Sequence, residues 1–267
     1  MDAATLARYL RRLGLDAPPP PTLSGLRALH RAHAASIPFE NLDILLGRPI
    51  RLDLPSLVAK LVDARRGGYC FEQNTLFAAA LEALGFPFTP LAARVRLGGR
   101  RDSARAHMCL SVSAEGRDWL SDVGFGGGGL WEPIPLEPAG EVRQGSWRFR
   151  IVEDGRERVL QNVGPEGWRD LYAFTLEPQL PIDYVVANHY TSTHPDCAFT
   201  RVPVAQRTRA DGAEILRGDV LQTVKPGEAP VESSAPEGDA LLALLRERFG
   251  LDFPEGTRFR PRGDAPA

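Results

Sequence analysis

The chain has 267 residues, of which 43% are hydrophobic and 25% charged, a composition typical of a globular protein with a large core. Its net charge of −2 gives no reason to expect nucleic acid or an anionic membrane as a partner. No segment approaches the ~18 consecutive apolar residues of a membrane span, and the three cysteines include no Cys-x-x-Cys pair. We therefore expect a soluble, cytoplasmic protein.

The first third of the chain has the periodicity of helices. Apolar residues recur at helical spacing in several segments, and Gly14 and Gly85 mark two of the stops. Asp53 or Ser56 is suited to cap one of the helices. The spacing predicts helices over 6–13, 24–35, around 57–61, and from Cys70 to about residue 84.

After Pro87 the pattern changes to the alternation typical of strands, with turn residues between the runs. The order along the chain is therefore helical, then β, then mixed. We expect strands at 91–97, 108–112, 119–123, 147–153, 158–163 and 171–176, a loop over 188–195, strands near 199–209 and 214–224, and a closing helix over 239–249.

The segment Arg66–Asn74, RGGYCFEQN, places a thiol directly before a predicted helix. Gly67 and Gly68 can adopt backbone conformations closed to other residues, which would turn the chain sharply and leave Cys70 uncrowded. The N–H groups and dipole of a helix N-terminus favour a thiolate over a thiol. The alternative is a buried structural cysteine. This alternative suits Cys109, in a predicted strand, and Cys197, in a polar loop, better than it suits Cys70. Cys70 is thus a candidate nucleophile that needs a base.

His107 begins one predicted strand and Asp122 ends the next. If residues 114–117 form the connecting loop, Ser113 lies opposite Asp118, and every second residue from there shares a face. His107 and Asp122 then become diagonal neighbours on one face, close enough to hydrogen-bond. A loop one residue longer or shorter would separate them. Sequence alone does not show that Cys70 reaches His107, and a structural imidazole that satisfies local hydrogen bonds is the alternative.

Several motifs resemble those of one known family, the arylamine N-acetyltransferases. Arg66–Asn74 looks like the signature of that family. Ile37–Asp43 (IPFENLD), His107-Met108, Asp122–Gly126 (DVGFG) and Ser192–Pro195 (STHP) resemble its other motifs in the same order. The resemblance spans nearly the whole chain.

The resemblance implies an α+β fold with a Cys70–His107–Asp122 triad. It also implies a helical domain over 1–86, a β-barrel domain over 87–187 and an α/β lid over 188–267, around a cysteine-protease-like core. The family moves an acetyl group from acetyl-coenzyme A, as co-substrate, to arylamines, arylhydrazines or N-hydroxyarylamines. It does so by a ping-pong route through an acetyl-cysteine, with no metal or bound cofactor.

Other positions match the family's motifs residue by residue. Phe39 and Phe125 resemble the aromatic residues that line the acceptor pocket. Gly126, Gly127 and Gly128 resemble a glycine-rich loop near the coenzyme, which Thr193 is expected to border as well. As alternatives, single phenylalanines pack in cores and glycine runs form plain turns. A last group resembles a structural ion-pair cluster behind the cysteine: Glu40, Arg66 and Arg12.

His30 and His33 lie three apart on a predicted helix, a spacing compatible with a metal site, but no further ligand completes a set. We therefore expect no metal. Three other functions stay open. The first is a family member that takes another acyl donor or forms amides in natural-product assembly. A cysteine hydrolase or transglutaminase-like enzyme shares the triad, and a catalytically silent binding protein is the third. Neither the acceptor amine nor the oligomeric state follows from the sequence.

Overall fold

The computed structural model describes residues 1–261. Helices make up most of the first third of the chain, and every helix expected there forms. Two helices end in a π-helical segment, Val58–Asp63 after α4 and Leu245–Phe249 after α7. The helices are α1 (Ala3–Leu13), α2 (Leu23–Ser36), α3 (Leu42–Leu45), α4 (Leu54–Leu57), α5 (Cys70–Ala83), α6 (Pro181–Thr193) and α7 (Gly238–Leu244), with 3₁₀ turns at Leu97–Gly99 and Ala198–Thr200.

Side-chain caps fix where the first helices begin. The Asp2 and Thr22 side chains accept hydrogen bonds from backbone N–H groups in the first turns of α1 and α2. Asp53, rather than Ser56, caps α4, because its carboxylate accepts from the Ser56 N–H at 3.0 Å. Gly14 ends α1 in the left-handed conformation, with φ of 74°.

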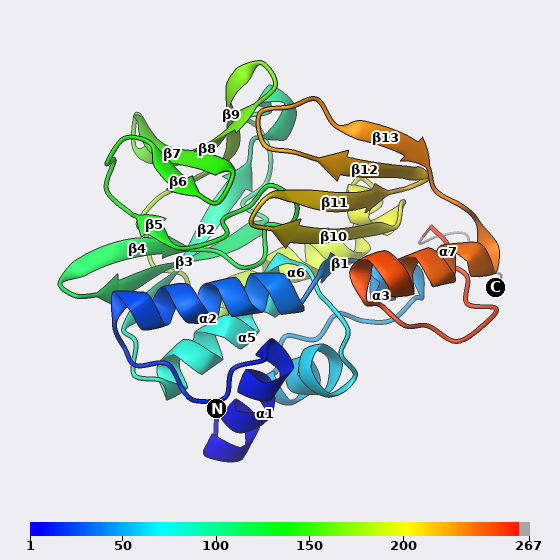
Figure 1. Ribbon diagram of the computed structural model, residues 1–267, viewed down its shortest axis with the longest axis horizontal. Helices are drawn as coiled ribbons and strands as arrows, with labels where there is room; N and C mark the ends of the chain where they lie inside the picture. Colours follow the sequence, from blue (N-terminus) through cyan, green and yellow to red (C-terminus); the bar gives the residue numbers. More distant parts are fainter. Residues whose placement is uncertain (262–267) are drawn as a thin grey trace.

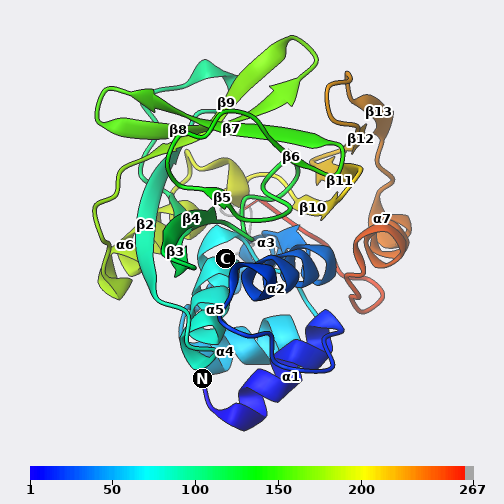
Figure 2. The same cartoon turned by 60° about the vertical axis from the view of Figure 1, so that its left-hand side comes forward.

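A first antiparallel sheet, of eight strands, forms most of a barrel (Figure 2). Its order is β5-β4-β3-β2-β9-β8-β7-β6. The side chain of Gln144 on β6 connects one edge to the segment just before the other, because it accepts from the N–H of Glu132, two residues before β5, and donates to its carbonyl oxygen at 2.7 Å. The strands are β2 (Phe88–Val95), β3 (His107–Ala114), β4 (Arg117–Ser121), β5 (Ile134–Pro135), β6 (Val142–Gln144), β7 (Trp147–Asp154), β8 (Glu157–Gly164) and β9 (Gly167–Phe174).

A second antiparallel sheet has the order β1-β10-β11-β12-β13 and lies beside the barrel (Figure 1). Its first strand comes from the N-terminal part of the chain, so this sheet joins the third region to the first. The segment expected as a strand over 214–224 is a hairpin of two strands. The five strands are β1 (Phe39–Glu40), β10 (Val204–Arg209), β11 (Gly212–Arg217), β12 (Val220–Val224) and β13 (Val231–Ser234).

Two further sequence expectations in this region were wrong in part. The strand expected near 199–209 begins only at Val204, because Ala198–Thr200 is a 3₁₀ turn. Residues 188–193 were expected in a loop, but they form the second half of α6, which ends at Thr193. Ile182, Val185 and Val186 of this helix recur at helical spacing, but they are exposed and do not face a core. The proposed division into 1–86, 87–187 and 188–267 stays a prediction, and its second boundary falls inside α6.

Three apolar clusters support these layers. One lies between the helices and β3, a second fills the barrel, and a third lies between the second sheet and α7. The α+β fold class is confirmed, with helices packed on antiparallel sheets. Within residues 1–261, no helix has the length and apolar character needed to cross a membrane.

Candidate active site

Cys70 is the first residue of α5 and is almost completely buried. Its Sγ lies 3.8 Å from the carbonyl oxygen of Ala106, directly before His107 in the chain. The start of α5 is fixed by Glu72, whose carboxylate accepts from the Tyr69 N–H at 3.1 Å. The sequence therefore places the thiol at a helix N-terminus, as expected, and the fold brings it to the first residue of β3.

The two glycines before Cys70 serve a different purpose from the one expected. Neither Gly67 nor Gly68 has a positive φ. A Cβ on Gly67 would lie 2.2 Å from the carbonyl oxygen of Pro38, and one on Gly68 would lie 2.8 Å from a carboxylate oxygen of Glu72. Glycine is required because backbone and side chains approach closely, so the expectation of an unusual backbone conformation was wrong.

The strand register that joins His107 to Asp122 is confirmed. Ser113 pairs with Asp118, and Ser111 with Leu120. The turn itself is shorter than expected, because Ala114 also pairs with Arg117 and only residues 115 and 116 form it, both with positive φ. The parity of the register is unchanged, and Nε2 of His107 lies 2.7 Å from Oδ2 of Asp122.

Electrostatics favour an ion pair between the two residues. Burial alone would lower the pKa of His107, but the charge and hydrogen bond of Asp122, together with Cys70, raise it to about 10. Burial alone would raise the pKa of Asp122, but His107 and further donors lower it. Because Nε2 faces the carboxylate, Nδ1 is the nitrogen left for the thiol. The site can hold an imidazolium beside Cys70 at neutral pH.

Asn74, one turn after Cys70 on α5, connects this helix to Asp122 and to β3. Its Nδ2 donates to Oδ1 of Asp122 at 3.0 Å and to the carbonyl oxygen of Met108 at 2.8 Å. Oδ1 of Asp122 also accepts from the N–H of Gly124 at 2.9 Å. A Cβ on Gly124 would lie 2.8 Å from Cα of Cys70. Close packing of this loop on α5 thus holds the carboxylate in place.

His30 and His33 are fully buried, and both ring nitrogens of each form hydrogen bonds. Nε2 of His30 accepts from the N–H of Asp122 at 3.2 Å, and Nδ1 donates to the carbonyl oxygen of Trp131. Nδ1 of His33 accepts from the Tyr9 hydroxyl, and Nε2 donates to Gln73. Burial lowers the pKa to about 4 for His30 and about 3 for His33, so both are neutral. They support the site through hydrogen bonds to the backbone of Asp122 and to the side chain of Gln73.

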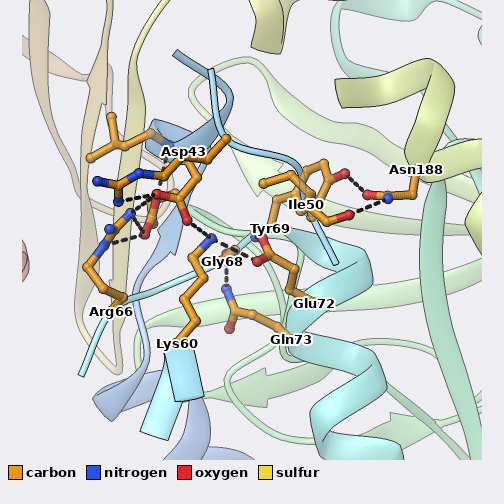
Figure 3. Close-up of polar contacts among 12 residues, drawn as sticks. Asp43, Ile50, Lys60, Arg66, Gly68, Tyr69, Glu72, Gln73 and Asn188 are labelled. Carbon is orange, nitrogen blue, oxygen red and sulfur yellow. Dashed lines mark hydrogen bonds and ion pairs between the residues drawn. The ribbon is translucent and has the colours of Figure 1, made fainter. Parts of the chain in front are cut away.

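A buried ion-pair cluster lies on the other side of the catalytic turn (Figure 3). Nζ of Lys60 lies 2.8 Å from Glu72 and 3.0 Å from Asp43. Arg66 contacts Glu40 at 2.6 Å and also Asp43. Burial alone would lower the pKa of Lys60, but the surrounding carboxylates, led by Glu72, raise it. The cluster ties α5 to α3 and β1.

Arg12 does not belong to this cluster, contrary to the expectation. It donates to the backbone carbonyl oxygens of Leu61 and Arg65. On the far side of the turn, the Tyr69 hydroxyl donates to Asn188 of α6, whose amide donates to the carbonyl oxygen of Ile50 (Figure 3). The segment before Cys70 is therefore held from both sides.

Phe39 and Phe125 line one small cavity of ≈ 20 Å³ next to the site. The ring of Phe125 also lies edge-on to His107, with 5.3 Å between ring centroids, and Tyr172 packs on both. Asp122 and Gln206 line the same cavity. The two phenylalanines predicted to contact substrate thus meet beside the His–Asp pair, one from β1 and the other from the loop after β4.

The glycine-rich loop is held by side chains of both sheets. The N–H of Gly127 donates to Gln206, and Thr208 donates to the carbonyl oxygen of Gly126 at 3.0 Å. Asn162 of β8 donates to the carbonyl oxygen of Gly128 at 2.9 Å. Gly126 and Gly128 both have positive φ, at 90° and 91°. The loop lies at the junction of the barrel and the second sheet.

The remaining predicted positions lie apart from this junction. Thr193 ends α6, and its hydroxyl donates to the carbonyl oxygen of His189; its coenzyme role stays a prediction. Cys109 is fully buried, and burial raises its pKa well above the ordinary value. Burial also raises the pKa of Cys197. Neither has the setting of Cys70.

Sequence reasoning missed several residues of the site. Asn74 stood in the signature segment, four residues after Cys70, and helical spacing alone could have placed its amide on the same face. Tyr172, Gln206 and Asn162 gave no such signal, because they reach the site only through pairing of distant strands.

Comparisons with known proteins agree with this geometry. A family model described as N-acetyltransferase matches residues 22–257. An arylamine N-acetyltransferase of Mycolicibacterium smegmatis is 42% identical over 261 residues, covering 94% of this chain and 93% of that protein. An arylamine N-acetyltransferase / N-hydroxyarylamine O-acetyltransferase of Salmonella typhimurium is 37% identical over 248 residues, covering 92% and 88%.

The fold leads to the same group of proteins. The solved structure of Mycobacterium marinum arylamine N-acetyltransferase in complex with CoA superposes with a TM-score of 0.86 at 34% identity, covering 92% of each chain. Sequence and fold therefore agree over nearly the full length. This chain is an acyltransferase and belongs to the arylamine N-acetyltransferase family.

Proposed function

We propose that this enzyme transfers the acetyl group of acetyl-coenzyme A to arylamines, arylhydrazines or N-hydroxyarylamines, with Cys70, His107 and Asp122 as its catalytic residues. The observation that carries the proposal is the 2.7 Å contact between His107 and Asp122 beside a thiol at a helix N-terminus. The names of the Mycolicibacterium smegmatis and Salmonella typhimurium relatives support the acceptor class.

The first half-reaction acylates the enzyme. The Cys70 thiolate attacks the thioester carbonyl carbon, and the carbon–sulfur bond to coenzyme A breaks as the tetrahedral intermediate collapses. The imidazolium of His107 gives its proton to the departing sulfur. Exchange of one thioester for another is nearly isoenergetic, so the protein chiefly supplies an activated nucleophile and positioning.

The second half-reaction transfers the acetyl group to the amine. His107 is now neutral and accepts a proton from the amine nitrogen as that nitrogen attacks acetyl-Cys70. The Cys70 thiolate leaves, which restores the starting thiolate and imidazolium. Asp122 remains ionised throughout and keeps the ring oriented.

For the acceptor, we propose the cavity lined by Phe39 and Phe125. At ≈ 20 Å³ it holds about one water molecule. An aromatic ring therefore enters only if side chains move, and Phe125, half-buried on a loop, is the best placed to do so.

For the donor, we propose the junction at Gly126–Gly128. Gly127 lines a further cavity there, and the loop's glycines leave backbone open to a ligand. The complex of the Mycobacterium marinum enzyme with CoA supports coenzyme binding. Thr193 as a coenzyme contact and a cytoplasmic location remain predictions from the sequence.

Intact mass spectrometry after exposure to acetyl-coenzyme A tests the proposal. We expect a single acetyl adduct that maps to Cys70, its loss on addition of an arylamine, and no thioester adduct in Cys70→Ser. Cys109→Ser, which removes a buried cysteine outside the site, should acetylate like the wild type. An unmodified wild-type protein, or an adduct retained in Cys70→Ser, would contradict the proposal. Release of acetate at the same rate without an amine would indicate a hydrolase.

A further inference from the structure

A cavity of ≈ 210 Å³ opens between the mouth of the barrel and the second sheet, with Gly127 on its wall. Three cationic side chains line it from three places in the fold. Arg169 comes from β9, Arg217 ends β11, and Lys225 follows β12. Glu228 is the one carboxylate among the residues described as lining it. The cavity therefore carries an excess of positive charge, which favours an anionic ligand.

Arg169 differs from the other two because its guanidinium is held in place. Its Nε donates to Oδ1 of Asn162 at 2.8 Å, and Nδ2 of the same Asn162 donates to the carbonyl oxygen of Gly128. A Cβ on Gly128 would lie 3.5 Å from Nη2 of Arg169. The glycine loop, the amide and the guanidinium thus form one hydrogen-bonded unit at the cavity wall.

Within residues 1–261, no carboxylate forms an ion pair with Arg169, in contrast to Arg66 and Arg96. Burial lowers its pKa, which indicates a cation partly withdrawn from water without a counter-charge. The residue still remains exposed at the mouth of the cavity, where a ligand can reach it. An anion with oxygen acceptors would supply the missing charge, and a phosphate suits the planar fork of arginine.

We propose that Arg169 binds a phosphate group of the acyl-coenzyme A donor, oriented by Asn162, with Arg217 and Lys225 adding positive charge. This inference rests on the proposed function. It assigns Arg169 to donor binding, not to chemistry, because it lies on the coenzyme side of the glycine loop. Its loss should therefore weaken donor binding and leave acetyl transfer from bound donor unchanged.

The chain offers a matched control in Arg150 of β7. Its Nε donates to the side-chain oxygen of Gln161 at 2.7 Å, much as that of Arg169 does to Asn162. Gln161 and Asn162 are neighbours on β8, so their side chains point to opposite faces of the sheet. The Arg150 guanidinium stacks over Trp168, 4.2 Å from the ring centroid, and does not line the cavity.

The experiment compares wild type, Arg169→Gln and Arg150→Gln with two donors. Acetyl-coenzyme A carries the phosphates, whereas S-acetylpantetheine has the same thioester arm without them. We expect Arg169→Gln to raise KM for acetyl-coenzyme A about tenfold and to leave kcat unchanged. A tenfold change in affinity corresponds to the loss of one charge-assisted hydrogen bond. KM for S-acetylpantetheine should not change, and Arg150→Gln should match the wild type with both donors.

A third donor, acetyl-3′-dephospho-coenzyme A, identifies the phosphate. If the KM effect of Arg169→Gln disappears with this donor, Arg169 binds the 3′-phosphate; if the effect persists, it binds the diphosphate. Unchanged KM in Arg169→Gln, or an equal rise with both acetyl-coenzyme A and S-acetylpantetheine, would overturn the inference. Those results leave the proposed function intact as long as wild-type Cys70 is acetylated.

Discussion

Nε2 of His107 and Oδ2 of Asp122 lie 2.7 Å apart, between side chains that are both almost fully buried. Their contact follows from the pairing of β3 with β4 and from the loop that packs against Cys70. In this setting the carboxylate keeps a proton on the imidazole and turns Nδ1 toward the thiol.

Removal of the Asp122 charge should abolish most of the acylation. In Asp122→Asn the imidazole loses its counter-charge and its fixed orientation, and we expect the rate of Cys70 acetylation to fall roughly 10³–10⁴-fold. Rapid-quench mass spectrometry measures this rate. Asp118→Asn is the control and should acetylate normally, because Asp118 is an exposed residue of β4, the strand that ends directly before Asp122. A rate in Asp122→Asn within tenfold of the wild type would exclude the triad.

Acid should destabilise the protein through its buried neutral histidines. The pKa of His33 falls from 6.5 to about 3 on folding. Between these two pKa values the unfolded chain binds a proton that the folded protein excludes. The free energy of unfolding is therefore unaffected by His33 above pH 6.5 and falls as the pH drops from 6.5 toward 3. Between pH 7 and pH 5 the loss should reach about 2 kcal/mol.

Urea unfolding at both pH values measures this loss. His33→Gln keeps polar atoms at the site without a titrating ring, so its stability should change less between pH 7 and pH 5 than that of the wild type. His189→Gln, at an exposed position on α6, should retain the wild-type dependence. Parallel pH curves for wild type and His33→Gln would contradict the prediction.

A methyl group at Gly124 should disable the site. The added Cβ would lie 2.8 Å from Cα of Cys70, so the loop carrying Asp122 must move away from α5. We expect Gly124→Ala to lose about 1–3 kcal/mol of stability from overpacking and about 100-fold in acetylation rate from misplacement.

Gly140→Ala provides the comparison. Gly140 has a φ of 77° and no neighbouring atom within 4 Å of an added Cβ, so alanine there is strained without a clash. It should lose about 1 kcal/mol of stability and retain full activity. Equal activity losses in the two variants would mean that the close approach of Gly124 to Cys70 is not what matters.

The contact between Lys60 and Glu72 should show strong coupling in unfolding experiments. Lys60→Met leaves the buried carboxylate of Glu72 without its cation, at a cost of about 3 kcal/mol. Glu72→Gln should cost less, because Lys60 keeps its ion pair with Asp43. The double variant removes both charges and should lose less than the sum of the two single variants. Urea unfolding of all four proteins gives the coupling energy, and simple additivity would contradict the pairing.

The helix ends and the β3–β4 hairpin could be predicted because they depend on neighbours in the chain. Caps at Asp2, Thr22 and Asp53 act over three residues or fewer, and the hairpin register needs only a turn length and the alternation of strands. The same alternation placed His107 and Asp122 on one face. The motifs, taken together, identified the family.

Contacts between distant segments could not be predicted in this way. The sequence by itself determined that Cys70 begins a helix and that His107 can meet Asp122, because helix and strand periodicity are local properties. Only the tertiary structure decided why Gly67 and Gly68 are glycines, that Gln206 holds the loop at Gly127, and that Arg169 lines a basic cavity. These features depend on how closely backbones pack and on which strands become neighbours, and a linear pattern of residue types encodes neither.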